Sequence, residues 1–123
     1  VYKRQPYTPP INIIYGLNAS LDYILRIGVE NYHEIHRMRA ELLYKGIELE
    51  PVPKEHLIRS YTVTAFYTDK PGEIIAELKR YGYIIAGGMG KLKDRSIRIG
   101  VMGDITVDDL NRVVEVVNKV VNR

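Results

Sequence analysis

The sequence of 123 residues contains no cysteine and no apolar run long enough to cross a bilayer. Without cysteine the chain has neither a disulfide framework nor a thiolate metal site, and we expect a cytoplasmic protein. Without a run of about 18 apolar residues, no membrane span is predicted. The 18 basic and 15 acidic residues leave a net charge of +3 and form no stripe of one sign. The composition therefore gives no reason to expect nucleic-acid or membrane binding.

The spacing of the apolar residues predicts four helices and a small sheet. Residues 1–10 hold three prolines, which fix the backbone and remove donors, so we expect an extended arm or linker there. Helical spacing predicts helices over about 11–27, 29–45, 71–81 and 107–121, and Gly28 is predicted to end the first of them. Stretches rich in β-branched residues predict strands over 47–50, 61–68, 83–87 and 96–102. This order predicts an α+β fold over residues 11–123, with two N-terminal helices followed by a small, mostly antiparallel sheet that has helices packed on one face.

The last helix has the clearest start signal. Thr106 followed three residues later by Asp109 predicts a capping box, and Ile105 and Leu110 have the spacing of a hydrophobic staple. Valine is a mediocre helix former, so the valine-rich stripe of this helix is expected to pack against the sheet. The stripe comprises Leu110, Val113, Val114, Val117, Val120 and Val121.

Arg98 is the most unusual residue of the predicted sheet. On a strand, Ile97, Ile99 and Val101 point to one side, which we expect to be the core. The residues on the other side are Ser96, Arg98, Gly100 and Met102. A charged group there needs a partner, and the guanidinium fork suits a carboxylate. The pattern alone leaves two readings open. The partner of Arg98 is a ligand, or Arg98 is exposed to solvent or paired with an acidic residue of the same chain.

Other candidate motifs carry less information. The stretch "GGMGK" at 87–91 lacks the P-loop spacing and lies between two strands, so a tight turn is predicted. His33 and His36 lie three apart on a helix, which is too few ligands for a metal site, and His36 is predicted to be structural. The sequence shows no nucleophile–base arrangement and no paired carboxylates, so we predict no catalytic residue and no metal site in this chain.

Several blocks taken together resemble a known family. They are "YTPP" at 7–10, "HR" at 36–37, "IAGGMG" at 85–90 and "IRIGVMG" at 97–103. In order and spacing they resemble the C-terminal part of the class V, fold type I, pyridoxal-phosphate-dependent aminotransferases, and most closely the alanine–glyoxylate and serine–pyruvate group. The resemblance covers about residues 6–121. It implies that residues 11–123 are the small domain of a longer aminotransferase, and that residues 1–10 lead in from a missing large domain.

The resemblance also implies roles for individual residues. In that family the arginine of the "RIG" block binds the α-carboxylate of the substrate, which is Arg98 here. The threonine ahead of the proline contacts the phosphate of the cofactor held by the other subunit of a homodimer, which is Thr8 here. Gln5 stands where family members often carry a tyrosine, and its amide can donate a hydrogen bond to the same phosphate.

The cofactor implied by the resemblance is pyridoxal 5'-phosphate. The family's Schiff-base lysine and the aspartate on the pyridine nitrogen lie in the upstream domain, so we expect this chain to be inactive alone. The complete enzyme is expected to move an amino group from alanine, serine or aspartate to glyoxylate or pyruvate. Related lyases and hydrogenase-associated subunits share the small domain, so the parent's reaction stays open.

Two alternatives belong to other classes. The stretch "TVTAFYTDKPGEIIAELKRYGYII" at 62–85 is similar to the opening of the ACT domains, which bind amino acids as regulators. Such a module would bind its ligand at the turn near Asp69–Gly72, whereas an aminotransferase domain would bind it on the Arg98 face of the sheet. The other alternative is a dimerisation domain with no ligand of its own.

Overall fold

The computed structural model describes residues 8–123, so Gln5 lies outside the described residues. The chain divides into two compact units, residues 1–34 and residues 35–123. Helix α2, Val29–Gly46, begins in the first unit and ends in the second. Among residues 8–123 no helix combines the length and the apolar composition that a bilayer span needs.

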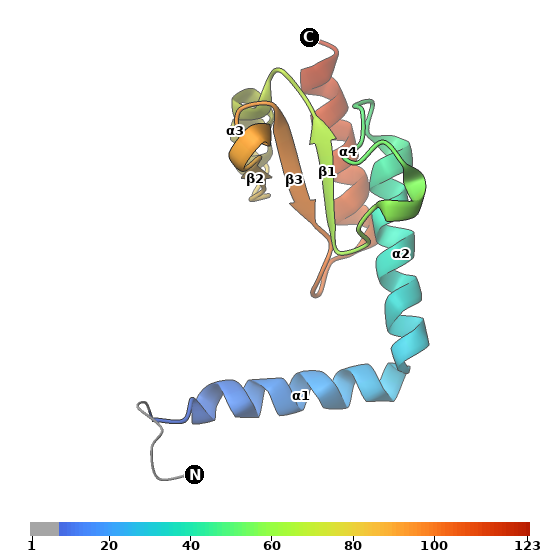
Figure 1. Ribbon diagram of the computed structural model, residues 1–123, viewed down its shortest axis with the longest axis vertical. Helices are drawn as coiled ribbons and strands as arrows, with labels where there is room; N and C mark the ends of the chain where they lie inside the picture. The colour runs from blue at the N-terminus through green and yellow to red at the C-terminus, as the bar shows by residue number, and fades with distance from the viewer. Residues whose placement is uncertain (1–7) are drawn as a thin grey trace. The chain divides into compact units, whose positions relative to one another are not determined.

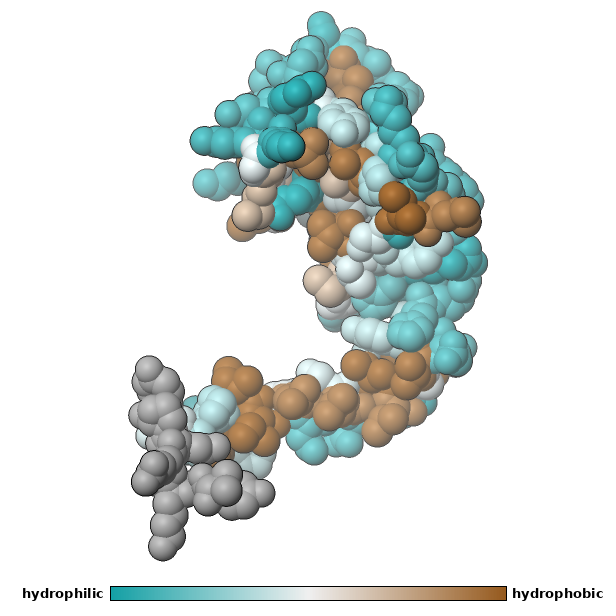
Figure 2. Space-filling view, in the orientation of Figure 1, coloured by the Kyte–Doolittle hydropathy of each residue, from teal (hydrophilic) through white to brown (hydrophobic). Residues whose placement is uncertain are grey.

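The first unit is dominated by helix α1, Ile11–Ile27. Gly28 ends this helix with φ of +88°, and its N–H donates to the carbonyl of Ile24 at 2.9 Å. This is the stop that the sequence predicts, because glycine adopts positive φ without steric cost. No α1 side chain is buried in the described structure, and Figure 2 shows apolar side chains gathered along the helix.

The second unit contains an antiparallel sheet of three strands in the order β1-β3-β2. The strands are β1, Val63–Tyr67, β2, Ala86–Gly87, and β3, Ser96–Gly100. Helix α3, Pro71–Arg80, connects β1 to β2, and helix α4, Val107–Val121, follows β3. Short 3-10 turns lie at His56–Ile58 and Gly90–Leu92. The predicted α+β class and the small antiparallel sheet are confirmed.

Helix α4 forms much of the core and lies across one face of the sheet (Figure 1). Its capping box is present: Asp109 N–H donates to Thr106 Oγ1 at 3.1 Å, and Thr106 N–H donates to the Asp109 carboxylate at 3.1 Å. The buried stripe differs from the predicted one, since it includes Val116, whereas the predicted Val114 and Val121 are only partly buried. The side chains that α4 buries are Leu110, Val113, Val116, Val117 and Val120.

The prediction of a strand over residues 47–50 is wrong. Instead, Pro51 forms an isolated bridge with Phe66, and Val52 N–H donates to the Ala65 carbonyl at 2.8 Å. A proline cannot donate to a ladder, so pairing along this edge does not extend into a strand. The predicted strand over 83–87 is also too long, because only Ala86–Gly87 pairs and Ile84 is 88% exposed.

Candidate functional site

The candidate site is the face of β3 that carries Arg98. Ile97, Ile99 and Val101 are buried at 0%, 3% and 0% exposure, as the alternation predicts. Arg98 lies between them on the opposite side of the strand and is half-buried. The central strand therefore presents a cation on the sheet face away from the core.

The neighbours of Arg98 across the sheet are small. Ala65 of β1 and Ala86 of β2 are its cross-strand partners on either side. Gly100, two residues along β3, shares its face and is exposed. Because cross-strand side chains stand only about 5 Å apart, larger residues at these positions would cover the guanidinium.

One hydrogen bond orients the Arg98 head group. Its Nε donates to the Gly87 carbonyl at 2.8 Å. Its two terminal nitrogens have no hydrogen-bond or ion-pair partner among residues 8–123. Every ion pair found in the described part of the chain uses another cation. A guanidinium held at Nε with both terminal amino groups free can offer a carboxylate two parallel hydrogen bonds.

The glycine-rich loop between β2 and β3 brings Gly87 to Arg98. Gly90 has φ of +54°, as the predicted tight turn requires. A Cβ on Gly88 would lie 2.0 Å from the Leu92 carbonyl oxygen, so only glycine fits there. The loop also buries Ser96, which the alternation places on the open face with Arg98. Ser96 is fully buried because this loop packs over it, and its hydroxyl donates to the Leu92 carbonyl at 3.1 Å.

Thr8 and the two histidines lie elsewhere in the chain. Thr8 precedes α1 and is exposed, with no hydrogen-bond partner in the described structure. His36 is 5% exposed, which agrees with the prediction of a structural histidine, and His33 is exposed. Among residues 8–123 no three potential metal ligands gather into a group.

Sequence reasoning missed Arg39, on helix α2. Its Nη1 donates to the carbonyls of Val101 and Gly103 at 3.3 and 3.0 Å, and its Nη2 donates to the carbonyl of Ile105 at 2.6 Å. These carbonyls belong to the loop that follows the Arg98 strand. No residue pattern could reveal this contact, because the acceptors are main-chain atoms more than 60 positions away.

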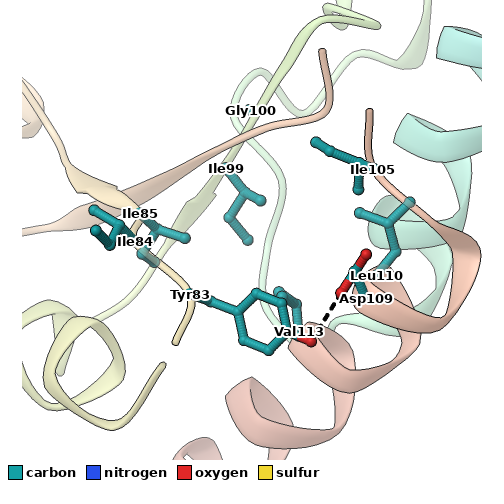
Figure 3. A pocket seen from close by; sticks show the side chains of 9 residues that line it. All are labelled: Tyr83, Ile84, Ile85, Ile99, Gly100, Ile105, Asp109, Leu110 and Val113. Carbon is teal, nitrogen blue, oxygen red and sulfur yellow. Dashed lines mark hydrogen bonds between the residues drawn. The ribbon is translucent and has the colours of Figure 1, made fainter. Parts of the chain in front are cut away.

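A cavity of about 190 Å³ lies at the end of the sheet, where β2 no longer pairs with β3. Figure 3 shows that its polar edge is the hydrogen bond from Tyr83 to Asp109, at 3.1 Å. The Thr106 hydroxyl, the Thr106 N–H and then Tyr83 lower the pKa of Asp109, whereas burial and Asp109 raise the pKa of Tyr83. The lining residues are Tyr83, Ile84, Ile85, Ile99, Gly100, Ile105, Asp109, Leu110 and Val113.

The turn expected to bind a ligand in an ACT-like module is also open to solvent. A depression of about 540 Å³ at this turn includes Asp69, Asp94 and Arg95 among its lining residues. The turn itself is held by a hydrogen bond from Lys70 N–H to Thr68 Oγ1 at 3.1 Å. It therefore offers acidic groups and one exposed arginine, in contrast to the small neighbours of Arg98.

Comparisons with known proteins give the class. The chain is 37% identical over 111 residues to an uncharacterised aminotransferase of Methanocaldococcus jannaschii, covering 82% of this chain and 28% of that protein. It is 34% identical over 102 residues to alanine–glyoxylate aminotransferase 1 of Saccharomyces cerevisiae, covering 78% of this chain and 26% of the relative. The solved structure of pyridoxamine–pyruvate aminotransferase from Mesorhizobium loti matches with a TM-score of 0.85 and 26% identity, covering 98% of this chain and 33% of that one. No protein-family model matches the chain.

The chain is therefore homologous to aminotransferases, over about a quarter to a third of their length. Its relatives are the alanine–glyoxylate, serine–glyoxylate and pyridoxamine–pyruvate aminotransferases, and its structural neighbours are class V aminotransferases. The resemblance found in the sequence is thus confirmed. Aminotransferases as a class depend on pyridoxal phosphate.

Proposed function

We propose that residues 11–123 are the C-terminal small domain of a pyridoxal-phosphate-dependent aminotransferase, that residues 1–10 are its connecting arm, and that Arg98 binds the substrate α-carboxylate. The observation that carries the proposal is the state of the Arg98 head group. Nε is bonded to Gly87, and the terminal nitrogens have no partner among the described residues. The alanines on either side leave it accessible.

Charge and geometry support a carboxylate as the ligand. A half-buried guanidinium without an acid partner favours an anion, and its planar fork matches two oxygens of one carboxylate. Holding the carboxylate in one orientation also fixes the substrate's Cα, which is how a binding group contributes to rate. The names of the relatives support the class of substrate that we propose, a small amino acid such as alanine, serine or aspartate together with glyoxylate or pyruvate.

The residues of this chain suit a supporting role toward the cofactor. Pyridoxal phosphate supplies the electron sink for transamination when it is bound. The exposed hydroxyl of Thr8 is able to donate to a phosphate held by another polypeptide, which in a homodimer is the second subunit. The Schiff-base lysine belongs to the domain outside this chain, so the chain alone lacks activity.

A first experiment tests the isolated chain. It is mixed with pyridoxal phosphate, alanine and glyoxylate, and the visible spectrum and the amino-group transfer are followed. We expect no stable protein-bound cofactor absorbance and no transfer. A stable absorbance band that survives dialysis would contradict the assignment of the lysine to another domain.

A second experiment tests Arg98 in the complete aminotransferase that carries this chain. Arg98→Gln removes two charge-assisted hydrogen bonds of about 1.5 kcal/mol or more each, so kcat/KM for alanine should fall by about 100-fold or more. Arg98→Lys keeps the charge but lacks the planar fork, so its kcat/KM for alanine should lie between those of the unchanged enzyme and Arg98→Gln. Asp69→Asn is the control, and it should leave kcat/KM unchanged. If Asp69→Asn abolishes amino-acid binding and Arg98→Gln does not, the ligand site is the ACT-like turn.

A further inference from the structure

We propose that Arg39 is a positioning residue for the carboxylate site, because it holds the loop that follows the Arg98 strand. The inference rests on the proposed role of Arg98 and adds a residue to it. Arg39 belongs to helix α2, in the same unit as the sheet. It does not touch the substrate in this proposal, and it acts through the backbone of β3.

The hydrogen bonds of Arg39 tie three alternate carbonyls to one planar guanidinium group. Nη1 and Nη2 reach the carbonyls of Val101, Gly103 and Ile105 at distances from 2.6 to 3.3 Å. Gly103, in the middle of this loop, has φ of +95° and so turns the chain sharply. Charge-assisted hydrogen bonds are about twice as strong as neutral ones, so one arginine fixes both ends of the turn.

Beyond Arg98, strand β3 has lost its hydrogen-bonded neighbour on the β2 side, and it is this part of the strand that Arg39 holds. On its β2 side the pairing ends with Ala86 opposite Arg98. From there onward the strand borders the cavity lined by Ile84 and Gly100 (Figure 3). The last residues of β3 therefore have a neighbouring strand, β1, on one side only.

The Val101 carbonyl is available to Arg39 because the ladder with β1 ends at this residue. Val101 N–H still donates to the Thr62 carbonyl at 3.0 Å. Thr62 N–H cannot complete the pair, since it donates to the Ser60 hydroxyl at 3.2 Å. Arg39 thus takes the place of the next rung of the sheet, three residues after Arg98.

In this proposal the two arginines have different roles: Arg98 binds the carboxylate, and Arg39 keeps the Arg98 strand in place. Gly87 holds the Arg98 head group from the β2 side, and Arg39 holds the strand end that sets the direction of the Arg98 stem. Without Arg39, the segment after Arg98 can shift toward the cavity, and the guanidinium fork then meets the carboxylate less often in the right orientation. The expected loss is in substrate binding, and the chemical step is largely spared.

The test uses Arg39→Gln and Arg39→Lys in the complete enzyme, with Arg80→Gln as the matched control. Among residues 8–123 Arg80 pairs with Glu77 alone, on the surface of α3, and its side chain is 79% exposed. Arg39→Gln should raise KM for alanine and for glyoxylate about 10-fold while kcat stays within about twofold. Arg39→Lys should rescue part of the loss, since an ammonium can still donate to these carbonyls. Hydrogen exchange should quicken at residues 101–105 and stay slow in the core of α4.

Each alternative result overturns one identified statement. If Arg98→Gln leaves kcat/KM for alanine unchanged, the proposed function fails, whatever Arg39 does. If Arg98→Gln lowers kcat/KM but Arg39→Gln behaves like Arg80→Gln, the role of Arg98 stands and the positioning role of Arg39 is wrong. Exchange that quickens throughout the core, or failure of both Arg39 variants to fold, would show a general stabilising role and would also overturn the proposal.

Discussion

Gly88 lies next to the residue that anchors Arg98, and replacing it with alanine tests the geometry of the site. An added Cβ would lie 2.0 Å from the Leu92 carbonyl oxygen and 2.3 Å from Ser96 Oγ. Real Cβ atoms do not approach within 3.0 Å of another heavy atom, so the loop must move by about 1 Å. Both neighbours are held by the loop itself, through the Ser96–Leu92 hydrogen bond at 3.1 Å.

The cost of Gly88→Ala follows from what the shift would break. Overpacking costs about 1–3 kcal/mol, and each neutral hydrogen bond that is lost costs about 1 kcal/mol. The two bonds at risk are the Ser96–Leu92 bond and the Gly88 N–H to Ser96 carbonyl bond at 2.9 Å. The reduced freedom of the unfolded chain returns up to about 1 kcal/mol. We expect a net loss of about 2–4 kcal/mol.

Thermal unfolding measures this loss directly. At roughly 4 °C per kcal/mol for a chain of this size, Gly88→Ala should lower Tm by about 10 °C. Gly72→Ala is the control, because nothing lies within 4 Å of an added Cβ there. It should leave Tm unchanged or raise it slightly. If Gly88→Ala has the same Tm as Gly72→Ala, the loop does not pack on Ser96 as described.

Three further changes test the core and the cap of α4. Thr106→Ala removes the N-cap acceptor and should lower the free energy of unfolding in urea by about 1 kcal/mol. Thr106→Ser keeps a hydroxyl and should retain the stability. Equal stability of the two variants would contradict the role of the cap. The lowered pKa of Asp109 means that its stabilising contribution is complete above its unfolded pKa of about 4 and is lost as pH falls through the lower folded value. Thermal melts between about pH 2 and pH 6 should show this loss, and Asp109→Asn should make that part of the profile flatter. Phe66 is fully buried, so Phe66→Ala should lower the free energy of unfolding in urea by about 3–5 kcal/mol. Val63, on the same strand, is 37% exposed, and Val63→Ala should lower it much less. Similar losses for the two variants would place Phe66 outside the core.

The parts of the fold that depend on neighbouring residues could be predicted from the sequence. Gly28 ends α1, and Thr106 with Asp109 begins α4, because each signal acts within one helical turn. The alternation of Ile97, Arg98 and Ile99 also gave their sides of the strand correctly. These features need no knowledge of what packs against them.

The errors arose where distant segments decide the structure. The predicted strand at 47–50 has suitable residues, yet the pairing with β1 occurs at residues 50–52, where Pro51 limits it to one bridge. Ser96 has the parity of Arg98, but the loop that follows β2 covers it. Ile84 has a strand-like sequence around it, but the turn after α3 leaves it exposed. In each case the local sequence pattern favoured the predicted structure, and contacts with distant segments produced a different one.

The candidate site combines both kinds of information. The sequence could place Arg98 on a face, but it could not say that Ala65 and Ala86 stand on either side, since that depends on the register of β3 against both β1 and β2. The same arginine opposite an aspartate would be a structural ion pair. It is the small neighbours, and the single anchoring bond to Gly87, that make an external carboxylate the better partner. The inference about function therefore depends on strand pairing as much as on the arginine itself.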